Sequence, residues 1–232
     1  MAKGGLLEKV GVLDEFLSHA RSDVSAELRA KFTTASYSRG QFVFFEGDPA
    51  KNLYLLESGV LEASVIHSDG KTFIFSFIFP GDIFGEASVC GIDRYPFSAQ
   101  VRKEAKVYRI SGEEIKSAIE RDPSLCAYLI EDIGKKLDFS YTKARCIAGE
   151  RVEKRVACIL LKSLDHEGLK KDCYERVDHP LTNRDISGLI GSTEETVSRI
   201  MSRLKKENII KVENRQIVIL DREALAQYLE AD

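Results

Sequence analysis

The sequence lacks the long hydrophobic run that a membrane span requires. No apolar stretch approaches the ~18 consecutive residues that cross a bilayer as a helix, and residues 1–8 lack the hydrophobic segment of a secretory signal. With 44% hydrophobic and 31% charged residues, the composition is that of an ordinary soluble globular chain. Its 232 residues suit one large domain or two small ones. We therefore expect a soluble, cytoplasmic protein.

The sequence also lacks paired cysteines. Its five cysteines are Cys90, Cys126, Cys146, Cys158 and Cys173. None forms a Cys-x-x-Cys pair or lies beside a histidine cluster, the spacing typical of zinc sites and cysteine-ligated clusters. We therefore predict no metal site. An odd, scattered set fits a reducing compartment better than a disulfide framework, so we expect all five thiols to be structural or incidental.

A strong positive charge is absent as well, since 34 basic residues face 37 acidic ones for a net charge of -3. This value argues against a nucleic-acid partner only if the charge is evenly spread. Residues 1–150 carry the whole acidic excess, and residues 151–232 are neutral. Within the neutral part, residues 199–215 hold six basic side chains against two acidic ones. Such a surplus indicates either a DNA-contacting surface or the solvated face of a helix.

Residues 30–110 consist of short apolar runs separated by turns rich in glycine and proline. This spacing predicts an antiparallel β sandwich or barrel, and Gly70 marks a hairpin between two longer runs. In the second of these runs Phe73, Phe75, Phe77 and Phe79 alternate with Ile74, Ser76 and Ile78. Both faces of the strand are mostly apolar, so we expect both to be covered.

Two helices are predicted next. Ser111 is a suitable N-cap for a short helix over residues 111–119, and Asp122-Pro123 begins a longer helix that reaches residue 148. Along the longer helix one set of residues recurs every 3.5 positions: Cys126, Leu129, Ile133, Leu137, Ser140, Ala144 and Ile147. This period is typical of a coiled-coil dimer interface. The alternative is a helix packed on its own β domain. Gly149 is a natural hinge before another amphipathic helix over residues 152–164.

Residues 182–204 carry the pattern of a helix-turn-helix. Thr182 and Asp185 have the spacing of a capping box, Gly191 ends the first helix, and Ser192 with Glu195 repeats the capping spacing. On the second helix the expected buried face is Val197, Ile200, Met201 and Leu204. Residues 209–212 and 216–220 then form a hairpin, which reads as a wing.

The opposite face of the second helix has the chemistry to contact DNA bases. Arg199 can donate two bonds to guanine, Glu195 can accept from cytosine, and Ser198 can contact a base edge. The alternative reading is that Glu195 only caps the helix and Arg199 is an ordinary surface residue. The predicted DNA-binding residues are Thr182, Thr193, Glu195, Ser198, Arg199, Ser202, Arg203, Lys205, Lys211 and Arg215.

Three segments resemble the Crp/Fnr superfamily of bacterial transcription regulators. They are residues 46–59, with Glu-Gly-Asp and Leu-Tyr-Leu-Leu-Glu-Ser-Gly, residues 80–86, with Pro-Gly-Asp-Ile-Phe-Gly-Glu, and residues 189–199, with Leu-Ile-Gly-Ser-Thr-Glu-Glu-Thr-Val-Ser-Arg. The last segment is the most specific, and the resemblance covers about residues 12–230. It implies an α+β protein with an antiparallel, cyclic-nucleotide-binding-like β-roll (1–122), a dimerisation helix and hinge (123–149) and a winged helix-turn-helix (150–232).

The resemblance also implies a homodimer that binds a palindromic operator, contacts RNA polymerase and responds to a small-molecule effector. Glu195, Ser198 and Arg199 match the Fnr-like branch, so we expect a TTG-containing half-site rather than the TGTGA of the cAMP-binding branch. Such a chain is not an enzyme. A cupin-like enzyme would need histidine and carboxylate ligands in the barrel, where His67 is the only histidine. A regulatory subunit without DNA binding would have no helix-turn-helix.

The same resemblance limits the effector. In the cAMP-binding branch an Arg-Ser pair binds the cyclic phosphate, but this chain has Phe97-Ser98 there, and Arg94 is displaced by three residues. An unpaired buried anion costs ~3–5 kcal/mol, so we expect an aromatic or hydrophobic effector instead of cAMP. The predicted effector-binding residues are Phe75, Phe77, Gly85, Glu86, Phe97, Ser98, Ser140 and Tyr141. The alternative is that the phenylalanines simply fill the barrel.

An iron–sulfur cluster of the Fnr kind needs N-terminal cysteines, and none precedes Cys90. Haem-based sensing of NO or CO, with His67 or His19 as ligand, is the alternative function within the same family, although either histidine also suits an ordinary surface position.

Overall fold

The computed structural model describes residues 11–165, 175–176, 180–214 and 216–230, and the chain forms two compact units. The N-terminal unit comprises residues 1–65 and 75–137, and the C-terminal unit comprises residues 66–74 and 138–232. These boundaries differ from the predicted ones at 122/123 and 149/150, because the long helix is divided between the units and the tip of one hairpin belongs to the C-terminal unit. Each unit is described by itself.

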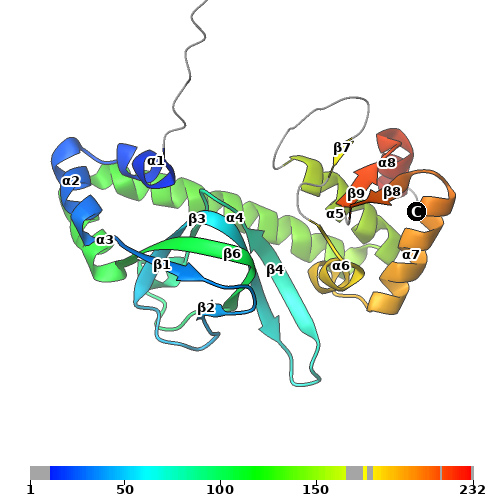
Figure 1. Ribbon diagram of the computed structural model, residues 1–232, viewed down its shortest axis with the longest axis horizontal. Helices are drawn as coiled ribbons and strands as arrows, with labels where there is room; N and C mark the ends of the chain where they lie inside the picture. The colour runs from blue at the N-terminus through cyan, green and yellow to red at the C-terminus, as the bar shows by residue number, and fades with distance from the viewer. Residues whose placement is uncertain (1–10, 166–174, 177–179, 215, 231–232) are drawn as a thin grey trace, which may run out of the picture. The chain divides into compact units, whose positions relative to one another are not determined.

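The N-terminal unit is built on an antiparallel sheet (Figure 1). Its strands are β1 (Thr33–Tyr37), β2 (Phe42–Phe44), β3 (Asn52–Ile66), β4 (Thr72–Ile78), β5 (Ile83–Phe84) and β6 (Ser98–Ser111). They lie in the order β1-β6-β3-β4, with β2 also pairing with β6 and β5 with β3. The register between β3 and β6 shifts near Gly59, whose φ is +99° and where a Cβ would lie 2.4 Å from the Glu104 carbonyl oxygen. Only glycine fits this irregularity.

Four helices and one short turn accompany this sheet: α1 (Val12–Ser18), α2 (Ser22–Lys31), the 3-10 turn η1 (Glu86–Ser88), α3 (Gly112–Arg121) and the first half of α4 (Pro123–Gly149). Ser111 caps α3 as predicted, because its hydroxyl accepts the Glu113 amide. Phe16, Leu28 and Leu125 are among the residues of a core between the helices and the sheet. A second core fills the interior of the sheet domain.

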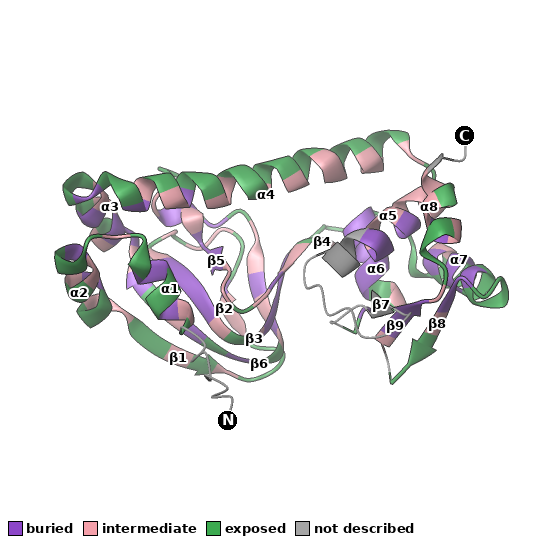
Figure 2. Cartoon of the chain, turned by 90° about the horizontal axis from the view of Figure 1, so that it is seen from above, coloured by how far each residue is buried: buried purple, intermediate pink, exposed green. Residues whose placement is uncertain are grey.

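Helix α4 begins at Pro123 as expected, but its predicted seam residues lie in different surroundings. Leu129 is buried in the core of the N-terminal unit, so this part of α4 packs on its own β domain. Leu137, Ser140 and Ala144 are exposed. Figure 2 shows buried residues on α4 only near its α3 end, with half-buried and exposed residues along the remainder.

The alternating strand β4 shows one covered face and one that is partly open. Ile74 and Ile78 are buried, whereas Phe75 is 40% exposed. The expectation that both faces are covered is therefore wrong at Phe75 within the single chain.

The C-terminal unit packs four helices around a small sheet. These are α5 (Val152–Asp165), α6 (Asn183–Ile190), α7 (Glu194–Lys206) and α8 (Arg222–Glu230), with the sheet order β7 (Glu175–Arg176), β9 (Gln216–Ile219) and β8 (Ile210–Glu213). Val156, Ile186, Val197 and Leu225 are fully buried in this unit. The two units together confirm the α+β architecture, and the hairpin of β8 and β9 is the predicted wing. Helix α8 was not predicted.

Candidate DNA-binding surface and effector-binding residues

The capping box that opens α6 is present as predicted. The Asp185 amide donates to the Thr182 hydroxyl at 3.2 Å, and the Thr182 amide donates to the Asp185 carboxylate at 2.9 Å. Asp185 is fully buried, so these bonds satisfy a carboxylate that has lost contact with water. At the other end Gly191 adopts the left-handed conformation, with φ +61°, and stops the helix.

The cap of α7 lies one residue later than the sequence suggested. Thr193, not Ser192, is the N-cap, and its hydroxyl accepts the Thr196 amide at 3.2 Å. The Ser192 amide instead donates to the Ser187 carbonyl at 3.0 Å, which closes the turn after α6. Ser192 therefore belongs to the turn, and Glu195 lies in the first turn of α7, where a carboxylate suits the helix dipole.

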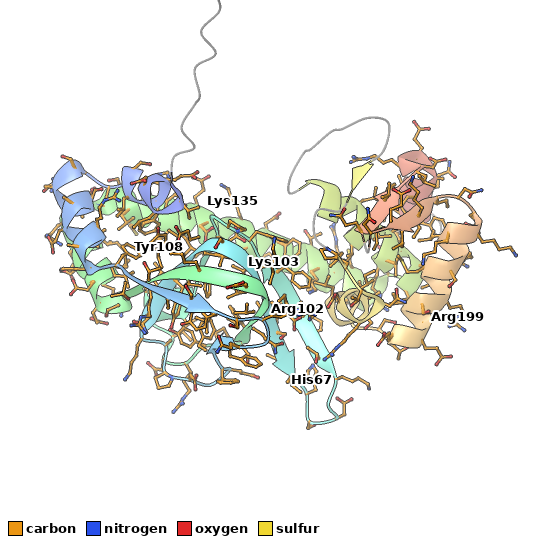
Figure 3. The ribbon with its side chains drawn as sticks, viewed as in Figure 1. His67, Arg102, Lys103, Tyr108, Lys135 and Arg199 are labelled. Carbon is orange, nitrogen blue, oxygen red and sulfur yellow. The ribbon has the colours of Figure 1, made fainter. Side chains whose placement is uncertain are left out.

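Helix α7 has two distinct faces. Val197, Ile200, Met201 and Leu204 are buried, as predicted from their spacing. Glu195, Ser198, Arg199 and Ser202 are exposed on the opposite face, and Figure 3 shows Arg199 on the outer side of α7. The arrangement leaves polar and charged side chains exposed at the N-terminal end of a helix whose other face is anchored, as a helix-turn-helix requires.

The basic residues further along differ in how they are held. The Arg203 guanidinium lies 3.5 Å from Glu153 of α5 and 5.7 Å from the ring centroid of Tyr228 of α8. Lys211 pairs with Glu213 at 2.8 Å. Lys205 is exposed. Arg203 therefore contacts two other helices of its own domain as well as adding positive charge. These contacts could not be read from the sequence, because Tyr228 lies on the unpredicted helix.

One predicted DNA-binding residue, Arg215, lies outside the described residues. Thr182 is exposed but its hydroxyl is bonded to Asp185, and Thr193 is exposed at the start of α7.

Within the C-terminal unit, residues 66–74 contact the first helix of the helix-turn-helix. A Cβ at Gly188 would lie 2.9 Å from the Ile74 side chain, so α6 and this segment meet at a glycine. Lys143 of α4 donates to the Ile74 carbonyl, and its ammonium lies 4.6 Å from the Phe73 ring centroid. Burial lowers the pKa of Lys143 to about 7. The only sequence signal for this contact is a glycine inside a helical pattern.

Glu86, a predicted effector-binding residue, is already engaged in the N-terminal unit. Its carboxylate binds the ammonium of Lys136 on α4, which also lies 2.7 Å from Asp132 and donates to the Ile83 carbonyl at 2.6 Å. Burial alone would lower the pKa of Lys136, but the charges of Glu86 and Asp132 outweigh it and raise that pKa. The preceding Gly85 has φ +81° and leaves no room for a Cβ.

The predicted aromatic residues join a larger aromatic cluster inside the sheet. Phe97 lies 5.7 Å from Phe44 and 6.2 Å from Phe75, ring centroid to centroid, and Phe44 stacks on Tyr95 at 3.8 Å. The sequence analysis missed the contribution of Phe44 and Tyr95. Phe77 is half-buried on β4.

Polar groups near this cluster have partners of their own. The Ser98 hydroxyl accepts the Glu46 amide at 2.9 Å, and Arg94 donates to the Gly47 carbonyl at 2.6 Å. Arg102 forms a 2.5 Å ion pair with Glu62, whose side chain is only 4% exposed. No sequence motif indicated this buried pair. Arg94 is thus engaged with the loop before β3 instead of supplying the missing phosphate ligand.

The remaining predicted residues lie apart from the aromatic cluster. Ser140 and Tyr141 are exposed on the part of α4 that belongs to the C-terminal unit, Tyr141 at 67%. His19 stacks on Tyr128 with centroids 3.8 Å apart, and His67 lies in the turn between β3 and β4 (Figure 3). In the part of the chain that the structure describes, no group of three His, Cys, Asp or Glu residues could hold a metal ion, and no helix is long and apolar enough to cross a membrane.

Comparison with known proteins follows the same division of the chain. Residues 34–122 match the cyclic nucleotide-binding domain, and residues 154–228 match the Crp-like helix-turn-helix domain. Together the two domains span well over half of the chain. The chain belongs to the Crp/Fnr superfamily of transcription regulators. It is a DNA-binding regulator and not an enzyme, as the sequence predicted.

Several members of the superfamily are similar along most of their length. The "CRP-like cAMP-activated global transcriptional regulator" of Mycobacterium tuberculosis is 26% identical over 221 residues, 93% of this chain and 99% of that protein. The "Fumarate and nitrate reduction regulatory protein" of Yersinia pestis is 27% identical over 190 residues, 82% and 75% of the two chains. The structure of FixK2 from Bradyrhizobium japonicum has a TM-score of 0.76 at 25% identity and covers 87% of this chain and 98% of that one.

Proposed function

We propose that this Crp/Fnr protein acts as a homodimer on a palindromic operator and that a small aromatic or hydrophobic effector controls its DNA binding. The observation that carries the DNA-binding part is the exposed row of Glu195, Ser198 and Arg199 on α7, opposite a fully buried apolar face. A protein that reads DNA in this way works in the cytoplasm, where the bacterial chromosome lies.

The proposed half-site contains TTG. Arg199 donates two hydrogen bonds to a guanine, and Glu195 accepts from the cytosine amine of a neighbouring pair. Because the domain as a whole is neutral, few phosphate contacts are available and these base contacts supply much of the discrimination. Selection of operators from random duplex DNA by the full-length protein tests this. Enrichment of paired TTG half-sites about one helical turn apart is expected, and enrichment of TGTGA instead would contradict it.

The proposed dimer forms along α4. Ile130, Leu137 and Tyr141 are exposed there at 64%, 48% and 67%, an unusual set of large apolar side chains on one helix. Their spacing of seven and four residues keeps them on one stripe of the helix. Light scattering of the full chain should give twice the monomer mass, and Leu137→Glu should shift it toward the monomer. A monomeric native protein that still binds the operator would overturn the dimer.

The proposed effector differs from cAMP because the phosphate ligand of the cAMP-binding branch is replaced by Phe97, which packs on Phe44 and Phe75. In the cAMP-binding branch the phosphate ligand is an arginine. Two arginines close in sequence to Phe97 already have partners here, since Arg94 donates to the Gly47 carbonyl and Arg102 pairs with Glu62. The M. tuberculosis relative is named as cAMP-activated, so cAMP is the ligand to test first. Calorimetry with cAMP should show no binding below millimolar concentration. Micromolar affinity for cAMP would refute the proposal.

The protein as purified identifies the effector class. Native mass spectrometry identifies any retained small organic molecule by its added mass. The absorption spectrum should lack a Soret band. A Soret band would instead establish the haem-sensing alternative.

Contact with RNA polymerase is also part of the proposal. Transcription in vitro from a promoter that carries the selected operator should change in yield when the protein is added.

A further inference from the structure

Two cysteines meet where α4 and α5 come together. The Sγ atoms of Cys146 and Cys158 lie 4.0 Å apart, although the residues are 12 positions apart in the chain. Both are half-buried thiols of the C-terminal unit and neither is in a disulfide. The sequence alone indicates five structural or incidental thiols, because the cysteine spacing matches no metal or disulfide motif.

A small cavity gives access to both sulfurs. Its volume is about 20 Å³, and Cys146 and Cys158 line it together with apolar side chains such as Phe139 and Leu189 and with the basic residues Lys143 and Arg155. This is room for roughly one water-sized molecule. Because both thiols are only half-buried, a small neutral oxidant such as hydrogen peroxide can approach the sulfurs, whereas a bulky charged disulfide such as oxidised glutathione does not fit the cavity.

Oxidation suits this pair better than metal binding. A stable soft-metal site needs three or four ligands, and the part of the chain that the structure describes contains no group of three such donors. A disulfide needs only the two sulfurs, brought from 4.0 Å to a bond length of ~2.05 Å. Rotation of the two side chains and a small shift of the helices can supply that approach.

We propose that Cys146 and Cys158 form a redox-modification site, at which hydrogen peroxide produces a reversible intrachain disulfide that clamps the joint between α4 and α5. In the first step one thiol loses its proton, its sulfur attacks a peroxide oxygen and the O–O bond breaks; the released hydroxide takes up that proton, so a sulfenic acid and water form. In the second step the other thiol loses its proton, its sulfur attacks the sulfenic sulfur and the S–O bond breaks; the released hydroxide takes up the proton, so the disulfide and a second water form. The two sulfurs lose two electrons and the peroxide gains them.

The clamp lies at a mechanically important place in this unit. Helix α4 ends at Gly149 and α5 begins at Val152, so the disulfide would span the bend between them. Arg155, which lines the same cavity, donates to the Glu150 carbonyl at 3.1 Å and to the Ile190 carbonyl of α6 at 2.7 Å. The bond would therefore fix the segment that also holds the end of α6.

The bond itself is tested by peptide mapping of the peroxide-treated full-length protein. Trypsin cuts after Arg145, Arg151, Arg155 and Lys162, so each cysteine falls in a separate peptide, residues 146–151 and residues 156–162. We expect a linked pair of these peptides that is lighter by two hydrogen atoms than their sum and that separates on reduction. Irreversible sulfinic acid at either position, or only intermolecular bonds through Cys90, would overturn the proposal.

The clamp is tested by limited trypsin digestion under native conditions, analysed on reducing gels. Arg151 is exposed in the bend between the cysteines, and a disulfide across the bend should slow cleavage there at least about tenfold. Cys146→Ser and Cys158→Ser should abolish the protection, and Cys90→Ser, at an exposed thiol of the N-terminal unit, should retain it. Equal cleavage rates in oxidised and reduced wild-type protein would refute the clamp, and this comparison requires no variant.

Discussion

The ammonium of Lys136 on α4 binds the carboxylate of Glu86, the residue that follows the left-handed Gly85. This ion pair connects the long helix α4 with residues 80–86, the segment that resembles the effector-binding segment of the family. Both partners belong to the same compact unit. The charge of Glu86 is thus already compensated by the protein. An incoming ligand that used this carboxylate would have to compete with Lys136.

Loss of Lys136 should destabilise the N-terminal unit. Lys136→Met leaves the carboxylates of Glu86 and Asp132 without their shared cation, and both are largely buried, at 17% and 24% side-chain exposure. Because Lys136 itself is 42% exposed, we expect a loss of about 1–2 kcal/mol in the free energy of unfolding, less than for a fully buried pair. Urea denaturation measures it. Lys135→Met is the matched control, since Lys135 is 73% exposed and its pair with Glu131 is worth little. Equal effects of the two substitutions would contradict the role of Lys136.

Lys143 should make the stability of the C-terminal unit depend on pH. Its pKa is about 7 in the folded protein and 10.5 as the ordinary value. Between these values the unfolded chain binds more protons, so stability rises with pH across the window from about 7 to 10.5. Lys143→Met should raise the melting temperature most at pH 7 and below, and the gain should fade toward pH 10.5. Thermal unfolding at several pH values checks this, and a gain that is constant with pH would disprove it.

Gly188 should resist replacement although it lies inside a helix. Alanine favours helices over glycine by about 1 kcal/mol, but a Cβ here would meet the buried Ile74 side chain at 2.9 Å and the Thr72 carbonyl oxygen at 3.3 Å. We expect Gly188→Ala to cost about 1–2 kcal/mol of unfolding free energy. Gly149→Ala, at the C-terminal end of α4 in the same unit, has no atom within 4 Å of the new Cβ, so it should be neutral or stabilising. Stabilisation by both changes would show that the contact at Gly188 gives way easily.

Arg199 and Lys205 should differ in what they contribute to DNA binding. Arg199→Lys keeps the charge and loses the two-bond geometry, so discrimination against a changed guanine should fall by about 1–3 kcal/mol. Lys205→Ala should weaken binding to specific and random DNA alike and reduce the salt dependence by about one counterion. Fluorescence anisotropy with both duplexes at several salt concentrations separates the effects. An unchanged ratio of specific to random affinity in Arg199→Lys would remove Arg199 from base readout.

The parts of the fold that were predictable depend on neighbours in sequence. The capping box at Thr182, the stop at Gly191 and the buried face of α7 follow from three- and four-residue spacings, which any helix imposes. The N-cap of α7 was misplaced by one residue, because Ser192 and Thr193 are both good caps. The structure shows that Thr193 is the cap, because its hydroxyl accepts the Thr196 amide while the Ser192 amide donates to the Ser187 carbonyl.

The sequence by itself determined the class of this protein, a β domain followed by a long helix and a winged helix-turn-helix, because periodicity and capping are local properties. Contacts between residues far apart in the chain were decided only by the tertiary structure. Lys136 with Glu86, Lys143 with Ile74 and Cys146 with Cys158 come from different elements, and no spacing rule relates their positions. Their energetics depend on burial and on the distance between two atoms, and both quantities exist only once the chain has folded.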